Sequence, residues 1–195
     1  MTLRKGLAAG LLALALAGPA VADDSVLAAF DGYRQAIAEG RGDDAGALVS
    51  ADSRAFYDVT RLAALDADGP DLDHLTMTEG LLALRLRAAL KPDQLRGLDG
   101  GGVIAATAAR GMIGTGTGGI RLGPAEVYGD HAVAEQLDGA ARPTGVWWRF
   151  VREGGAWRID LRPSLEAGDA LLQAKFQASG LSRADFLKQL ATNGR

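Results

Sequence analysis

Apolar residues follow a helical period through the first half of the chain. One stripe with steps of four, three and four positions consists of Val26, Phe30, Tyr33 and Ile37. This spacing predicts an amphipathic helix with one buried side, which Gly40 can end. The same pattern predicts a short helix over residues 43–49 and a longer one from about Ser53.

Two more helices are expected between a loop at residues 66–73 and residue 109. Thr76 and Glu79 have the spacing of a capping box, in front of a stripe made by Leu82, Leu86 and Leu90. Another helix is expected over about 92–109, broken or kinked by the glycines at 100–102.

The period changes to two after about residue 119, which predicts antiparallel strands. Gly129-Asp130 separates two strand-like runs, so a tight turn there places Tyr128 opposite His131. Leu122 and Leu137 are expected to continue the face that carries this pair.

A second hairpin is predicted around Gly154-Gly155 in "VWWRFVREGGAWRIDL". This turn pairs residues as Phe150–Ile159, Trp148–Leu161 and Arg152–Trp157. Alternation then gives one face to Trp148, Phe150, Trp157, Ile159 and Leu161, and so much apolar surface predicts burial. The other face carries Trp147 and the opposed charges of Arg149 and Asp160.

Helical spacing returns at about residue 164. Gly180 divides this segment into two helices, and Ser182 with Asp185 has the spacing of a cap for the second one.

Three stretches carry a resemblance to a known fold: "FDGYRQAIAEGRGDDAGALVS" (30–50), "VYGDHAVAE" (127–135) and "WWRFVREGGAWRIDL" (147–161). Together they resemble the NTF2-like superfamily. The resemblance implies an α+β fold in which N-terminal helices pack on a curved antiparallel β-sheet, forming a cone. We expect this domain over 23–163, with a helical insert at about 66–119 and an additional C-terminal helical extension at 164–195.

The N-terminus has the pattern of a secretory signal peptide over residues 1–22. Arg4 and Lys5 precede an apolar run, which Gly18-Pro19 interrupts before small residues at Ala20 and Ala22. We therefore expect a periplasmic or secreted protein. Because the chain has no cysteine, it lacks the residue that carries a bacterial lipid anchor. No membrane association is expected after cleavage.

The charge balance argues against nucleic acid as a partner. The net charge of −3 becomes −5 when residues 1–22, which carry two basic residues and no acid, are removed. A nucleic-acid-binding surface needs clustered basic residues.

Two motifs that could hold a cofactor or a metal lack the required context, so neither group is expected. "GMIGTGTGG" contains G-x-G-x-x-G at Gly114, Gly116 and Gly119, but a dinucleotide site needs a strand before the motif and a helix after it. Here the order is reversed. "DADGPDLDH" (66–74) is rich in Asp, but it does not fit the positions of a calcium loop.

The first hairpin also offers candidate acid–base chemistry. His131, Glu126, Glu135 and Tyr128 are expected on one face of the sheet. If that face is concave, it lines a pocket with groups whose pKa values can be tuned; if it is convex, the four side chains form a solvated surface.

Four aromatic residues are candidates for contact with a small apolar ligand: Tyr33, Phe56, Tyr57 and Trp147. Aromatic residues at helical spacing also serve as core. The sequence thus favours an exported, non-catalytic protein that binds a small apolar ligand or a protein partner through its cone pocket or sheet face. One alternative is a small acid–base enzyme, of isomerase, dehydratase or hydrolase type, that uses His131 with Glu126 or Glu135. Another is an assembly or inhibitor-type module whose C-terminal helices and outer sheet face contact a partner, and a homodimer is a further possible assembly.

Overall fold

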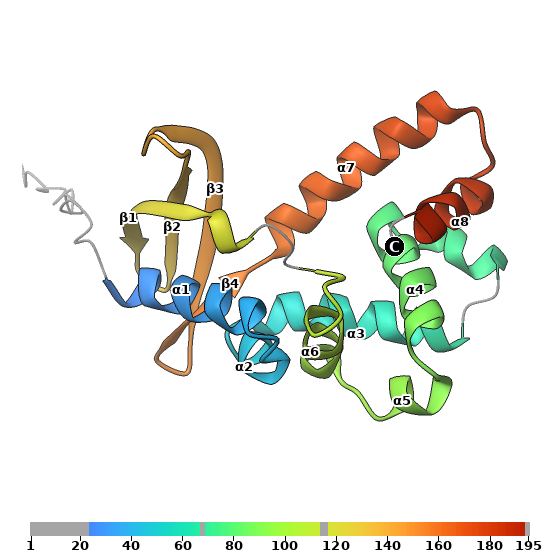
Figure 1. The fold of residues 1–195 in the computed structure, drawn as a ribbon, viewed down its shortest axis with the longest axis horizontal. Helices are drawn as coiled ribbons and strands as arrows, with labels where there is room; N and C mark the ends of the chain where they lie inside the picture. The colour runs from blue at the N-terminus through green and yellow to red at the C-terminus, as the bar shows by residue number, and fades with distance from the viewer. Residues whose placement is uncertain (1–23, 67–68, 114–116, 194–195) are drawn as a thin grey trace, which may run out of the picture.

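The protein has an α+β fold, seen in a computed structural model that describes residues 24–66, 69–113 and 117–193. Its helical elements are α1 (Asp24–Ala38), α2 (Gly42–Ala47), α3 (Ala51–Asp66), η1 (Gly69–His74), α4 (Met77–Ala89), α5 (Pro92–Arg96), α6 (Gly100–Ala108), η2 (Thr117–Gly119), α7 (Arg162–Ser179) and α8 (Arg183–Asn193). The four strands are β1 (Arg121–Tyr128), β2 (His131–Leu137), β3 (Pro143–Glu153) and β4 (Ala156–Asp160). The sheet and α1 form one end of the molecule, and α4, α7 and α8 form the other (Figure 1).

The strands form an antiparallel meander in the order β1-β2-β3-β4. Both predicted tight turns are present: Tyr128 pairs with His131, and Phe150 pairs with Ile159. Gly129, Gly154 and Gly155 adopt positive φ angles of 63°, 58° and 81°, a conformation that glycine allows without a steric penalty. The turn residues therefore fix the register of both hairpins.

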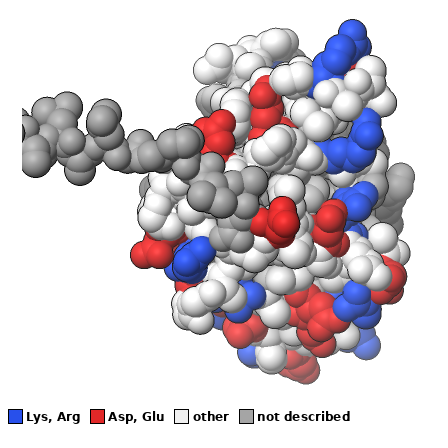
Figure 2. Space-filling view, turned by 90° about the vertical axis from the view of Figure 1, so that its left-hand side faces the viewer, with Lys and Arg blue, Asp and Glu red and all other residues white. Residues whose placement is uncertain are grey.

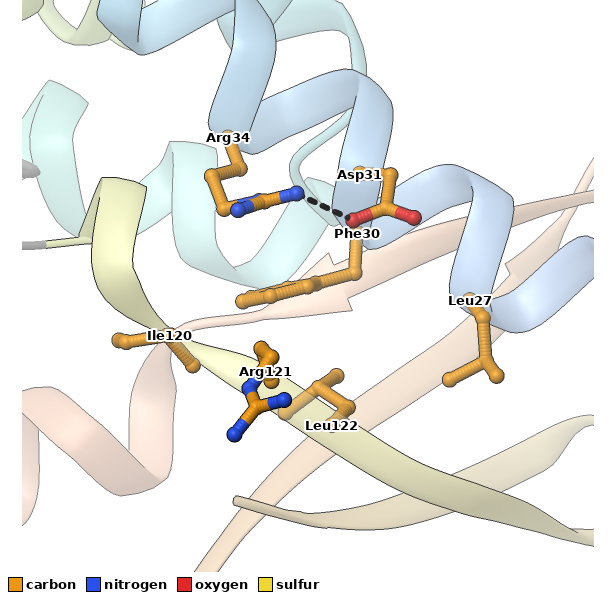
Figure 3. Close-up of a pocket in the computed structure, with 7 residues that line it drawn as sticks. All are labelled: Leu27, Phe30, Asp31, Arg34, Ile120, Arg121 and Leu122. Carbon is orange, nitrogen blue, oxygen red and sulfur yellow. Dashed lines mark hydrogen bonds and ion pairs between the residues drawn. The ribbon is translucent and has the colours of Figure 1, made fainter. Parts of the chain in front are cut away.

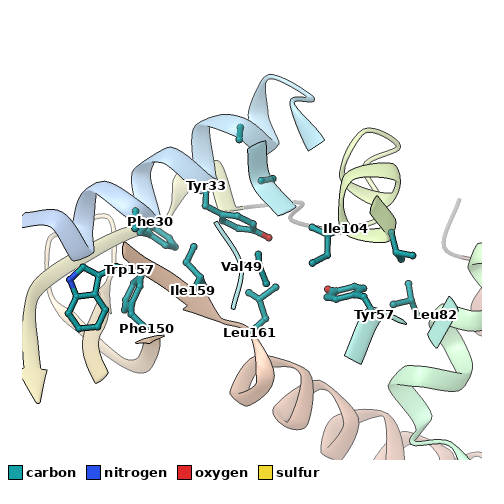
Figure 4. Close-up of a cluster of buried hydrophobic side chains, with 14 of the residues drawn as sticks. Phe30, Tyr33, Val49, Tyr57, Leu82, Ile104, Phe150, Trp157, Ile159 and Leu161 are labelled. Carbon is teal, nitrogen blue, oxygen red and sulfur yellow. The ribbon is translucent and has the colours of Figure 1, made fainter. Parts of the chain in front are cut away.

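Helix α1 covers the inner face of this sheet. Phe30 is 2% exposed, and its ring meets the Trp148 ring edge to face at a centroid distance of 4.7 Å. Phe150, Trp157 and Ile159 are buried beside it, as predicted (Figure 4). Leu161 is buried too, but the predicted Trp148–Leu161 pair is wrong. The ladder ends at the Arg149–Asp160 pair because Leu161 is the N-cap of α7, which begins at Arg162.

A short parallel bridge joins the helical half of the protein to the last strand. Val49 lies beside Ile159, whose N–H donates to the Leu48 carbonyl oxygen (2.8 Å) and whose carbonyl accepts from the Ser50 N–H (2.9 Å). The hydroxyl of Ser53, at the start of α3, accepts from the Leu161 N–H at 2.8 Å. These bonds fix α3 relative to β4.

The prediction for Leu122 is wrong. A register shift between Leu122 and Ala125 places Leu122 opposite Gln136, not Leu137. Gln136 lies on the inner face, where its side chain accepts from the Trp148 indole N–H (3.3 Å), and Leu122 packs against the main core. The bulge contains Pro124, which cannot donate a ladder hydrogen bond.

The break predicted at glycines 100–102 lies a few residues earlier. Helix α5 ends at Arg96 and α6 begins at Gly100, where the Asp99 side chain caps the Gly102 N–H at 2.8 Å. The glycines form the first turn of α6 because this turn lies directly against α3. A Cβ at Gly100 would lie 1.9 Å from the Arg54 backbone oxygen.

The C-terminal helices have the predicted division at Gly180, which adopts φ 67°. Ser182 caps α8 by accepting from the Asp185 N–H at 3.2 Å. A second, smaller core of Met77, Phe186 and Leu187 packs α8 against α4.

Among the described residues we find no helix with the length and hydropathy that a bilayer crossing requires. The predicted signal peptide at 1–22 lies outside the described residues.

Gly100→Ala should destabilise the protein, because the new methyl group has to displace backbone. We expect the free energy of unfolding to fall by about 2–3 kcal/mol. The matched control is Gly168→Ala in α7, where a Cβ meets nothing within 4 Å. That change should raise stability by about 0.5–1 kcal/mol through helix propensity. Urea denaturation of both variants measures the two effects; equal changes would contradict the close packing of α6 on α3.

Candidate functional site

The four candidate acid–base residues lie on one face of the sheet, as predicted, and this face points away from α1. Glu126 pairs with Val133 and Tyr128 with His131, while Glu135 pairs with Trp147 on β3. Tyr128 is 60% exposed, and Glu126 and His131 are exposed as well. The candidates therefore occupy the solvated outer face, the convex alternative considered above.

Two of the carboxylates on this face have local hydrogen-bond partners. Glu126 accepts from the Tyr128 hydroxyl, a bond that raises the pKa of this phenol above its ordinary value. Glu135 accepts from the Gly145 N–H at 2.7 Å, beside the register shift between β2 and β3. Glu135 therefore stabilises the irregular start of β3.

The four candidate ligand-binding aromatic residues are not brought together. Tyr33 and Tyr57 are each 3% exposed and belong to the main core, where their hydroxyl groups point toward the same interior region (Figure 4). Trp147 lies on the outer sheet face and is 46% exposed. Phe56 stacks edge-on against Tyr57 at 5.5 Å and lines a groove beside α7.

A hollow of about 250 Å³ lies between α1 and the start of β1; we call it the α1–β1 hollow. Figure 3 shows the side chains around it. Its apolar walls come from Leu27 and Phe30 on α1 and from Ile120 and Leu122 before and within β1. Its polar residues are Asp31, Arg34 and Arg121.

Hydrogen bonds to nearby groups hold two of the polar residues of the hollow in place. Arg34 donates to Asp31 one helical turn away, at 3.0 Å. Arg121 donates to the carbonyl oxygens of Asp138 and Gly139, at 2.9 and 3.0 Å. Two guanidinium groups and one carboxylate leave a net positive charge beside the apolar walls.

Sequence reasoning missed this hollow because it depends on the bulge in β1. Without the shift, Leu122 belongs to the outer face and the hollow loses one wall. The local signal is Gly123-Pro124, because proline within a strand is typical of edges and bulges.

A second hollow, of about 310 Å³, lies among α3, α4 and α7; we call it the α7 groove. It is lined by Phe56, Thr76, Glu79, Arg162, Leu165, Glu166, Asp169, Ala170 and Gln173. Phe56, one of the four ligand candidates, lies in this groove.

The two cofactor and metal motifs lie partly outside the described residues. Within the described residues, no three side chains of the His, Cys, Asp and Glu types come together as a metal centre. Gly114 and Gly116 of the glycine motif lie outside those residues, as do residues 67 and 68 of the Asp-rich loop.

Acidic and basic side chains are interspersed over the end of the molecule drawn in Figure 2.

Comparison of the chain with protein-family models, curated proteins and solved structures gives no match. The functional argument therefore rests on the hollows themselves.

The burial of Tyr33 and Tyr57 predicts that their phenol groups ionise only at a higher pH than an exposed tyrosine. Burial raises the pKa of Tyr33 to about 12 and raises that of Tyr57 as well, whereas Tyr128 is exposed. Of the three tyrosines, we expect only Tyr128 to ionise in the folded protein. Because the folded pKa of the other two exceeds the unfolded value of about 10, their contribution to stability is complete below pH ~10 and is lost as the pH rises toward 12.

Phenolate absorbance, followed together with circular dichroism, measures this titration. Tyr128→Phe should remove the early step and leave the step that accompanies unfolding. Ionisation of two or more tyrosines before any loss of secondary structure would contradict the assignment of Tyr33 and Tyr57 to the core.

Proposed function

We propose that this chain is an exported, non-catalytic NTF2-like protein that binds a small molecule in the α1–β1 hollow. The ligand that fits has an apolar body and one anionic group, such as a carboxylate. The main support for this proposal is that the hollow combines apolar walls with two guanidinium groups.

The assignment to the NTF2-like superfamily is supported by the arrangement of the sheet and its helices. Helix α1 crosses a four-stranded antiparallel meander, and the Val49–Ile159 bridge ties the following helices to the last strand. The export proposal rests on the pattern of residues 1–22.

The size and charge of the hollow support the ligand class. At roughly 30 Å³ for each water-sized unit, 250 Å³ accommodates on the order of eight to ten non-hydrogen atoms. Leu27, Phe30 and Leu122 offer apolar contact, and Arg34 and Arg121 can donate to an anionic oxygen. Planar guanidinium groups are well suited to carboxylates because they donate two parallel hydrogen bonds.

A binding role is favoured over catalysis because the acid–base candidates face the other way. His131, Glu126 and Glu135 are on the outer face of the sheet, whereas the hollow lies between the sheet and α1. A reaction in the hollow would need free proton-transfer groups within hydrogen-bond reach of the ligand, and the carboxylate that lines it, Asp31, is bound to Arg34 at 3.0 Å.

Titration with matched pairs of small molecules tests the proposal. Hexanoate and phenylacetate should cause saturable shifts of backbone NMR signals from α1 and β1, while hexanamide and phenylacetamide should bind about 10- to 100-fold more weakly. Loss of a charge-assisted hydrogen bond, worth roughly 1.5–3 kcal/mol, accounts for this difference.

Three variants test the site and its charge. Leu27→Trp should fill the hollow and abolish binding, and Ala28→Trp, the adjacent exposed position on α1, should leave it unchanged. Arg121→Met should remove the preference for acids over amides. Equal binding of acids and amides, or full binding by the Leu27 variant, would contradict the proposed ligand class or site.

A further inference from the structure

The α7 groove has uncovered apolar surface on both walls. Helix α7 is described over its whole length, and none of its 18 residues is buried. Its Leu165 and Ala170 line one wall, opposite Phe56 of α3. One helical turn beyond Phe56, Val59 is 46% exposed, so the apolar strip of α3 continues past the groove.

The rim of the groove is acidic. Glu79, Glu166 and Asp169 face one cation, Arg162. Asp169 accepts from the Thr78 N–H at 2.9 Å, and Glu79 accepts from the Thr76 N–H at 2.8 Å, so both carboxylates are held at the start of α4.

Glu166 is the carboxylate best placed to meet a cation from outside. Its side chain is 70% exposed, and its distance to Arg162 is 3.8 Å, long for an ion pair. It lies on the same helix as Leu165 and Ala170, so a molecule resting on the apolar wall reaches it directly.

We propose that the α7 groove binds a basic amphipathic helix from a partner protein. The apolar face of that helix packs between Phe56 and Leu165, and its Lys or Arg side chains meet Glu166 and its acidic neighbours. A second copy of this chain fits less well, because each copy carries a net charge of −3, or −5 without residues 1–22. The inference does not depend on the α1–β1 hollow, which lies at the sheet end of the molecule (Figures 1 and 3).

A designed probe tests this proposal without knowledge of the natural partner. The probe is a fluorescent helical peptide of about four turns with Leu on one face and Lys on the other. Its control has the same Leu positions and Glu in place of every Lys. Fluorescence anisotropy should show saturable binding of the Lys peptide that weakens as salt is added, and at least ten-fold weaker binding of the Glu peptide.

Paired variants show where the probe binds. Ala170→Trp should block the groove and reduce affinity at least ten-fold, while Leu171→Trp, the next exposed position on α7, should not. Glu166→Lys should weaken binding several-fold. Asp130→Lys, which makes the same change of charge in the β1–β2 turn, should have little effect. Circular dichroism of each variant tests whether it is folded.

Three results would overturn the proposal: equal binding of the two peptides, full binding by the Ala170 variant, or equal losses in the Glu166 and Asp130 variants. Titrating hexanoate into the Ala170 variant separates this proposal from the other one. Its carboxylate binding should be unchanged, since the two hollows share no lining residue.

Discussion

The packing of Phe30 against Trp148 and the inner face of β3 and β4 is the contact on which the remaining structure depends. Phe30, Phe150 and Ile159 are each 2% exposed or less, and Trp157 is 4% exposed. Burial of a large apolar side chain stabilises a fold by up to about 3 kcal/mol, so this cluster supplies a large share of the marginal stability of a domain. This packing also determines which face of the sheet is buried.

This choice of face determines where the α1–β1 hollow lies. The large rings fill the space between α1 and the middle of the sheet, and the remaining hollow lies at the β1 edge, where the bulge turns Leu122 inward. The same choice places His131 and Glu135 on the outer face. The helices beyond the sheet add the α7 groove, a surface that the sheet and α1 alone do not provide.

Local sequence was sufficient for the hairpins and the caps. Gly129 and Gly154-Gly155 set turn geometry within a few residues, and Thr76 with Glu79 makes its capping box from one turn of helix. Neither feature depends on the rest of the fold. The change of period near residue 119 separated the helices from the strands, and the family resemblance implied the α+β class that the structure has.

The α1–β1 hollow and the α7 groove were harder to predict, because both depend on contacts between segments that are distant in sequence. The side of β2 that faces α1 is marked by Ala132 and Ala134, which lie opposite the large rings of Phe150 and Trp148. The pairing of these small residues with large aromatic residues can be recognised only when the register between β2 and β3 is known. Phe56 and Tyr57 are neighbours in sequence, yet one lines a groove and the other is core, because the position of α7 separates their environments.

Quenching of tryptophan fluorescence in a Trp147→Phe variant tests the central claim most directly. The chain has three tryptophans, so this variant retains only Trp148 and Trp157 on the inner face. With α1 packed as described, its emission should lie at shorter wavelength than that of the unmodified protein, and acrylamide should quench it several-fold less than free indole. Emission and quenching like those of indole in water would show that the inner face is exposed to solvent. Helix α1 would then not pack on the sheet, and the α1–β1 hollow would not form.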